Sequence, residues 1–287
     1  MSQTSNLLHN EPLRKLVSEM QTLPSLPSVY RELMQILRTD DASVDQAARI
    51  ISKDVGMVTK ILQVVNSPLY GLRGKVSNPS HAVVLLGLST IRALVLSRNV
   101  FAQFDQSKLP FFSLEVLWQH GMAAGVHARA IVKEEAAEQT LTEDTFTAGL
   151  LHDVGTLVLA TNLPDQYTEM LALMQERDIS EWDAERTIFG ATHAEVGGYL
   201  LGQWRLNQTI VNAVAYHHEP SYAPAPVSLA LAALHVANAV EEETQAAALG
   251  TTFAPMDLDY LGACGLIDRL PLWQAICRDE AMSRAGC

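Results

Sequence analysis

Apolar residues recur every three or four positions along almost the whole chain, which is the spacing of helices that bury one face. The first such helix opens at Asn10 and Pro12. Its expected buried stripe is Leu13, Leu16, Val17 and Met20. No stretch alternates convincingly with the period of two that a half-buried strand would show. The pattern therefore predicts an all-α protein.

Helix start signals recur at polar residues that can cap a first turn. Asp54 can cap a helix over 55–65, and Thr192 with Glu195 forms a capping box. The other predicted start residues are Ser43, Ser89, Ser113, Thr142 and Ser180. Three of the predicted helices cover residues 89–104, 113–133 and 209–216.

Two interruptions of the helical pattern divide the chain. The prolines of the segment LPSLP at 23–27 forbid helix and indicate an extended connector. Polar residues and Pro110 interrupt the pattern again at 105–110. We predict four parts. They are an N-terminal helix or extension (1–22), a helical bundle (23–105), a second helical subdomain (111–243) and a C-terminal helical tail (244–287).

Composition narrows the function classes. The 287 residues are 48% hydrophobic and 18% charged, which is ordinary for a globular protein. Twenty Lys and Arg against 32 Asp and Glu give a net charge of −12, which argues against direct binding to nucleic acid or to an anionic membrane. The first ten residues are polar, and apolar runs such as 82–88 stop well short of the ~18 residues that a membrane span needs. We therefore expect no membrane insertion.

Cysteine usage points to a reducing compartment. The three cysteines, Cys264, Cys277 and Cys287, lie late in the chain and show no CxxC spacing. This argues against a zinc knuckle or a disulfide framework. We expect a cytoplasmic protein.

Six residues in the second half of the chain are of the types that hold metal ions. They are His120, His152, Asp153, His193, His217 and His218. A two-metal phosphoester hydrolysis site needs neutral imidazoles and a bridging carboxylate. Each of the six has an ordinary structural explanation by itself, such as a histidine at the C-terminal end of a helix. Their joint order across four predicted helices is what indicates a site.

That order resembles the HD superfamily of metal-dependent phosphohydrolases, and within it the HD-GYP phosphodiesterases. The first half of the chain resembles a narrower family, the HDOD (HD-related output domain) proteins. The matching segments are LPSLP at 23–27, ISKDVG at 51–56, VNSPLYG at 65–71, and the pairs 82–83 and 86–87. The resemblance runs from about Leu23 to Asn238. It implies an N-terminal helical bundle packed on an HD-like helical domain.

Two departures from the HD-GYP pattern weaken the chemistry that the resemblance implies. Thr156 stands where those enzymes place a lysine, and its hydroxyl cannot offer a cation to a phosphate. Asn238 stands where they place a metal-binding aspartate, and an amide is a neutral, weaker donor. The GYP loop after the His-His-Glu motif is also missing. We expect no catalytic residues, whereas the retained histidines imply a site for Fe, Mn, Zn or Ni.

Three hypotheses of function follow. The first is a non-enzymatic HDOD signal-transduction protein that acts through contacts with signalling proteins and whose degenerate HD site still binds metal. The second is a metal-dependent phosphohydrolase or phosphodiesterase that acts on a nucleotide or a cyclic dinucleotide. The third is a sensor in which metal or nucleotide shifts a partner-binding state.

A partner-binding surface is predicted in the N-terminal bundle, at the loop that holds Asn66, Pro68 and Tyr70. The family-specific residues of this half include no set able to do acid–base or metal chemistry, and loops on a rigid scaffold commonly carry recognition. Tyr70 is the natural anchor because aromatic residues dominate interface energetics. The alternative is structural: Asn66 caps a helix, while Pro68 and Tyr70 pack the two halves together.

Overall fold

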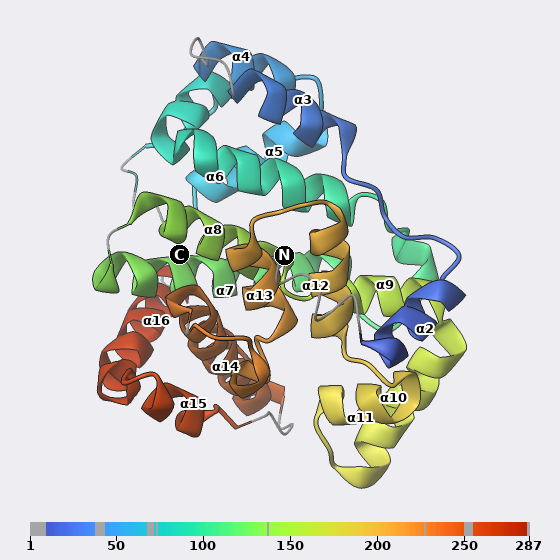
Figure 1. Ribbon diagram of the computed structural model, residues 1–287. Coiled ribbons are helices and arrows are strands. Elements are labelled where there is room, and N and C mark those ends of the chain that lie inside the picture. Colours follow the sequence, from blue (N-terminus) through green and yellow to red (C-terminus); the bar gives the residue numbers. More distant parts are fainter. Residues whose placement is uncertain are drawn as a thin grey trace. The chain divides into compact units, whose positions relative to one another are not determined.

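The computed structural model describes residues 10–37, 44–67, 72, 74–136, 138–226, 228–249 and 255–285, with side chains described except at 36–37, 246–249 and 279–285. Every regular element among these residues is a helix (Figure 1), so the prediction of an all-α protein is confirmed. The chain forms two compact units. The larger takes in residues 10–24 and 104–276, and the smaller takes in 25–103 and the residues from 277 onward.

Helix α6 organises the smaller unit. The helices of this unit are α3 (Ser28–Leu37), α4 (Val44–Ile51), α5 (Val55–Val65) and α6 (Pro79–Phe101). All of the first three pack against α6. The core between them includes buried Leu33, Ile51, Met57, Ile61 and Ile91. As predicted, α5 is capped by Asp54, whose carboxylate accepts a hydrogen bond from the backbone N–H of Met57.

The start of α6 differs from the prediction. The helix begins at Pro79 after its capping residue Asn78, and not at Ser89. Ser89 follows Gly87, whose φ of 79° and ψ of 154° interrupt the helix. Glycine adopts this left-handed φ without steric cost. The capping signal at Ser89 therefore falls where the helix resumes after a kink.

Helix α6 is also the one described helix that is long and apolar enough to cross a membrane. The prediction that apolar runs fall well short of that length is therefore wrong for this helix, by length and composition. Half of its apolar window is buried inside the protein, as in the core helix of a globular unit.

The larger unit contains the remaining helices. They are α2 (Glu11–Glu19), α7 (Leu114–Glu135), α8 (Gln139–Leu151), α9 (Val154–Asn162), α10 (Pro164–Arg177), α11 (Glu181–Phe189), α12 (His193–Gln203), α13 (Gln208–Ala215), α14 (Leu229–Leu249), α15 (Leu258–Ala263) and the first part of α16 (Leu270–Ala285). Short 3₁₀ turns occur at η2 (Gln106–Lys108), η3 (Pro220–Tyr222) and η4 (Ile267–Arg269).

Helices α7 and α8 form the centre of the larger unit and pack along each other, drawn in green in Figure 1. Helix α14 packs on both helices of this pair, α13 packs on α8, and α12 packs on α9 and α13. The core between them includes the buried side chains of Ile131, Phe146, Leu150, Val154 and Leu234. This packing brings the ends of several helices close to the long sides of α7 and α14.

Several caps in the larger unit match the sequence prediction. They are Ser113 for α7, Ser180 for α11, and Thr192 with Glu195 for α12. The predicted start at Thr142 is wrong, because α8 begins at Gln139. The Thr142 hydroxyl instead donates to the backbone carbonyl of Glu138 within the first turn. A threonine near a helix start bonds backward as readily as it caps, so the sequence signal is ambiguous.

The N-terminal helix α2 starts where it was predicted. The side chain of Asn10 accepts a hydrogen bond from the backbone N–H of Leu13, and both Leu13 and Leu16 are buried. The amide of Asn10 also donates to Glu195 on α12 at 3.0 Å. Helix α2 is therefore tied to the larger unit, while the division of the chain into four domains stays a prediction.

Asn66 ends α5 and fastens the segment that follows. Its amide donates to the carbonyls of Leu62 and Val76, each at 2.7 Å, and its Oδ1 accepts from the N–H of Val76 at 2.7 Å. These bonds favour the capping role for Asn66. Pro68 and Tyr70 lie outside the described residues, so the partner-binding loop stays a prediction.

Candidate metal centre

All six predicted metal-binding residues lie in the larger unit, most of them at helix ends. His120 lies within α7, His152 ends α8, Asp153 precedes α9, His193 is the first residue of α12, and His217 and His218 follow α13. A side chain at a helix end can point away from its own helix, while the packing of the helices fixes where that end lies. The six residues, although as many as 98 positions apart, are thereby brought to one place.

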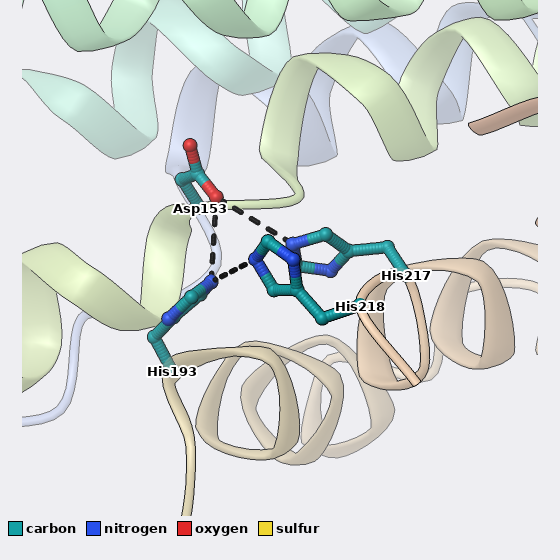
Figure 2. A group of neighbouring side chains, drawn as sticks. All are labelled: Asp153, His193, His217 and His218. Atoms are coloured by element: carbon teal, nitrogen blue, oxygen red, sulfur yellow. Dashed lines mark hydrogen bonds and ion pairs between the residues drawn. The ribbon is translucent and has the colours of Figure 1, made fainter. Parts of the chain in front are cut away.

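The carboxylate of Asp153 lies at the middle of this group. Its Oδ2 is 3.5 Å from Nε2 of His120 and 3.1 Å from Nε2 of His152. Its Oδ1 is 3.6 Å from Nε2 of His193 and 3.7 Å from Nε2 of His217 (Figure 2). Asp153 thus presents one oxygen to each of two pairs of histidines, which is the position of a bridging carboxylate.

The donor atoms form two groups that share Asp153. One group comprises His120, His152 and Asp153, and the other comprises Asp153, His193, His217 and His218. Within each group the donor atoms lie within 4.8 Å of one another. Two ligands with bonds of about 2 Å to one metal ion are separated by about 3–4 Å. Both groups are therefore compact enough for an ion.

An unsatisfied nitrogen supports the fit to a metal ion. The Nε2 atom of His217 is buried and has no hydrogen-bond partner among the described residues, and it faces the carboxylate of Asp153. Leaving a buried polar atom unpaired costs free energy, so such an atom calls for a ligand. The donor set of imidazoles around one carboxylate fits a transition metal.

Backbone carbonyls orient two of the imidazoles. Nδ1 of His152 is 2.8 Å from the carbonyl oxygen of Gly149, and Nδ1 of His217 is 2.8 Å from that of Val214. A carbonyl only accepts, so the hydrogen of each neutral ring lies on Nδ1 and the lone pair of Nε2 faces the centre. This is the arrangement that metal-bound histidines use.

Glu185 orients a third imidazole, and sequence reasoning missed it. Its Oε2 accepts from the backbone N–H of His193 at 2.9 Å and lies 2.8 Å from Nδ1 of the same residue. The side chain is fully buried. The only sequence signal was its spacing of four from apolar Phe189, which places both on one face of α11.

Charges in the centre differ from one imidazole to the next. Burial lowers the pKa of His120, and burial together with neighbouring imidazoles lowers the pKa of His217 and His218 well below the usual value. These three rings are neutral at pH 7, as metal ligands must be. Burial also opposes charge on His193, but the Glu185 carboxylate outweighs it and raises the pKa of His193 to about 10.

Asp153 itself stays ionised. Burial raises the pKa of its carboxyl, but the surrounding imidazoles, His152 first, outweigh burial and hold that pKa well below the usual value. In return the Asp153 charge raises the pKa of His152 against the effect of burial. The centre therefore offers a carboxylate, not a carboxylic acid, to a cation.

Helix α14 contributes polar side chains that contact both ring nitrogens of His120. Nε2 of His120 is 2.9 Å from Oδ1 of Asn238, and Nδ1 of His120 is 3.1 Å from the amide nitrogen of Gln245. The Asn238 amide donates to Oε1 of Glu242 at 2.7 Å. Burial raises the pKa of Glu242 to about 7. The sequence singled out Asn238 but neither Glu242 nor Gln245.

A cavity of about 890 Å³ opens onto the centre, where Asp153, His193 and His218 line it. Its walls also include four aromatic side chains: Phe111, Phe112, Tyr167 and Trp182. Trp182 stacks on His218 with ring centroids 4.5 Å apart. A cavity of this size with aromatic walls is typical of a small-molecule site.

The charges along this cavity are almost all negative. Among the lining residues that the structure describes, five carry carboxylates and none is Lys or Arg. The five are Asp153, Asp178, Glu181, Asp183 and Glu242. Thr156, where related enzymes place a lysine, is buried and also lines the cavity. An anionic ligand would therefore find positive charge only at bound metal or at a protonated histidine.

Comparison with known proteins agrees with this picture. The model of the HDOD domain matches residues 23–220, which is more than half of the chain. A protein of Treponema pallidum (strain Nichols), described as uncharacterized, is 26% identical over 212 residues. The match covers 73% of this chain but only 40% of that protein, so this chain spans less than half the length of that relative.

Solved structures share the fold. An HDOD domain protein with unknown function from Geobacter sulfurreducens matches with a TM-score of 0.74 and 23% identity, over 97% of this chain and 94% of the other. A provisionally named phosphohydrolase from Shewanella amazonensis SB2B matches with a TM-score of 0.68 and 22% identity, over 96% and 99%. A provisionally named signal transduction protein from Marinobacter aquaeolei VT8 has a TM-score of 0.69 and 17% identity, over 98% and 68%.

At these identities the structures show the fold alone, whereas the domain match extends over the N-terminal segments and all five histidines that the sequence singled out. The resemblance predicted from those segments is confirmed. The chain belongs to the HDOD domain family.

Proposed function

We propose that this protein is a signal-transduction protein that acts through protein contacts and binds a divalent transition metal at Asp153, without hydrolysing phosphoesters at enzyme rates. One observation carries the proposal. The two oxygens of Asp153 each face a pair of imidazoles, yet the described residues that line the cavity beside them include no lysine or arginine. The site is thus equipped to hold a cation and poorly equipped to stabilise the charge that develops on a phosphoryl group.

Two ions could be held by the residues present. One would bind to Asp153, His193, His217 and His218, and the other to Asp153, His120 and His152. Mixed imidazole and carboxylate donors suit Fe, Mn, Zn or Ni. When bound, such an ion supplies positive charge that can hold and polarise an oxygen of an anionic ligand.

The residues of the chain itself argue against fast hydrolysis. Thr156 has a neutral hydroxyl, and Asn238 places an amide oxygen, not a carboxylate, beside His120. Removing one preorganised electrostatic group typically lowers a catalytic rate by ~10²–10³. Two such groups are altered here. Fold alone does not determine activity, so the expectation of slow or absent hydrolysis rests on the residues of the site.

The second candidate function is metal-dependent hydrolysis of a nucleotide or a cyclic dinucleotide. The cavity favours it, because its volume of about 890 Å³ can take a ligand of that size and it opens directly onto the proposed metal-binding residues. Aromatic walls could stack on a base. The two functions differ in turnover and not in the metal site.

Metal content and turnover measured together test the proposal. We expect about one to two transition-metal ions per chain in the purified protein by inductively coupled plasma mass spectrometry, and none in Asp153→Ala. An Asp165→Ala variant, which changes an exposed aspartate on α10, is expected to keep the metal. Neither bis-p-nitrophenyl phosphate nor a cyclic dinucleotide should be hydrolysed measurably.

Two results would overturn the proposal. Wild-type protein that takes up no transition metal when it is supplied would exclude the metal centre. Hydrolysis at ordinary enzyme rates, a kcat of about 1–10³ s⁻¹ that is lost in Asp153→Ala, would establish the second candidate function.

We also propose that the smaller unit binds the signalling partner and that the protein is cytoplasmic. Both rest on the sequence.

A further inference from the structure

The two donor groups around Asp153 are unequal. The group with His193 has four donors, whereas the group with His120 and His152 has three. The next oxygen at the incomplete edge is Oδ1 of Asn238, 2.9 Å from Nε2 of His120. It belongs to a neutral amide, so among the described residues of the two donor groups Asp153 would be the only carboxylate in contact with two divalent ions. The His120 side therefore lacks a second carboxylate whose negative charge would balance the charge of the ion there.

Glu242 lies directly behind this edge. Its Oε1 accepts a hydrogen bond from Nδ2 of Asn238 at 2.7 Å and lies 3.9 Å from Nδ1 of His218. The Glu242 carboxylate thus contacts Asn238, which lies beside His120 of one donor group, and lies near His218 of the other group. Its side chain is only 27% exposed, and it lines the cavity that opens onto Asp153.

We propose that Glu242 supplies the carboxylate charge that Asn238 lacks. Together, the amide oxygen of Asn238 and the carboxylate of Glu242 take the place of one aspartate ligand. The inference rests on the proposed metal centre. A hydrogen bond from the Asn238 amide to a carboxylate polarises that amide and increases the negative charge on its Oδ1, which faces His120. The same carboxylate, near Nδ1 of His218, favours the tautomer of that ring that frees Nε2 for metal.

The ordinary alternative is a structural pair. Asn238 and Glu242 are four residues apart on α14, and such neighbours often form hydrogen bonds on a helix surface. Glu242→Gln separates the two roles. The glutamine oxygen can still accept the bond from Asn238, so a structural pair keeps its geometry while the charge is lost.

A charge exchange provides the decisive test. In the double variant Asn238→Asp with Glu242→Gln, the carboxylate and the amide change places, and the hydrogen bond between positions 238 and 242 can form in reverse. Glu243→Gln is the matched control, because Glu243 is the next residue on α14 and is exposed. Binding of Mn²⁺ and Zn²⁺ is measured by calorimetry on metal-free full-length protein, together with its melting temperature.

We expect Glu242→Gln to bind metal about 10–100-fold more weakly than the wild type, the usual effect of losing an outer partner of a metal site. The double variant should recover most of that loss, and Glu243→Gln should bind like the wild type. The double variant keeps the net charge and the hydrogen bond, so it shows whether one carboxylate at either position sustains metal binding even if Glu242→Gln folds poorly.

Wild-type affinity in Glu242→Gln, or a double variant as weak as that single variant, would overturn the role of Glu242 and leave the metal centre intact. Failure of all four proteins, the wild type included, to bind either ion would instead overturn the metal centre itself. The two failures are therefore distinguishable.

Discussion

Gly155→Ala tests whether the close approach of α9 and α12 sets the geometry of the centre. A Cβ at Gly155 would lie 1.9 Å from the carbonyl oxygen of His193, 2.7 Å from its carbonyl carbon and 2.9 Å from the backbone nitrogen of Gly197. All three are backbone atoms, so no side chain can rotate out of the way. Ordinary contacts of this kind begin at 3.4 Å, so the two helices must separate locally by roughly 1.5 Å.

The size of the effect follows from this clash. Overpacking a core typically lowers the free energy of unfolding by about 1–3 kcal/mol, and a clash between backbones belongs at the upper end. At about 2–4 °C per kcal/mol for a protein of this size, the melting temperature should fall by about 6–12 °C. His193 also moves relative to Asp153, now 3.6 Å away, so metal affinity should fall at least ~10-fold.

The assay is thermal unfolding followed by circular dichroism in metal-free buffer, with a parallel metal titration. Gly262→Ala on α15 is the matched control, because a Cβ there would meet no atom within 4 Å. Its stability should be unchanged or higher by up to about 1 kcal/mol, since alanine favours helix. A Gly155→Ala variant with wild-type melting temperature and metal affinity would refute the reasoning about this contact.

Two further predictions concern the residues around His193. Glu185→Gln should weaken metal binding by about 10–100-fold in calorimetry, because it removes the charge that holds the Nδ1 hydrogen, while Glu134→Gln on an exposed part of α7 should have no effect. Equal affinity in the Glu185 variant would show that the contact does not position the imidazole. Since the pKa of His193 is raised to about 10, metal must displace a proton from this ring at neutral pH. Affinity should therefore rise by about tenfold or more per pH unit between pH 7 and 9, and a flat profile over that range would contradict the charge assigned to His193.

Local signals located most helices because their physical causes are local. Spacing of apolar residues selects the helical period, and a polar side chain caps the turn directly after it. Asp54 and the pair Thr192 with Glu195 were read correctly for this reason. Ser89 and Thr142 were misread, because a residue able to cap can equally follow a kink at Gly87 or bond backward within a first turn.

The sequence by itself determined the all-α class, the family and the types of residue available to hold a metal. Which of them meet is decided by helix packing, since Asn238 reaches His120 from 118 positions away. Glu185 is fully buried, against the rule that charged residues face water, so periodicity could not reveal it. Nor could periodicity show that Glu242 contacts Asn238 and lies near His218. Only the tertiary structure shows these contacts, because burial of a charge depends on partners supplied by other helices.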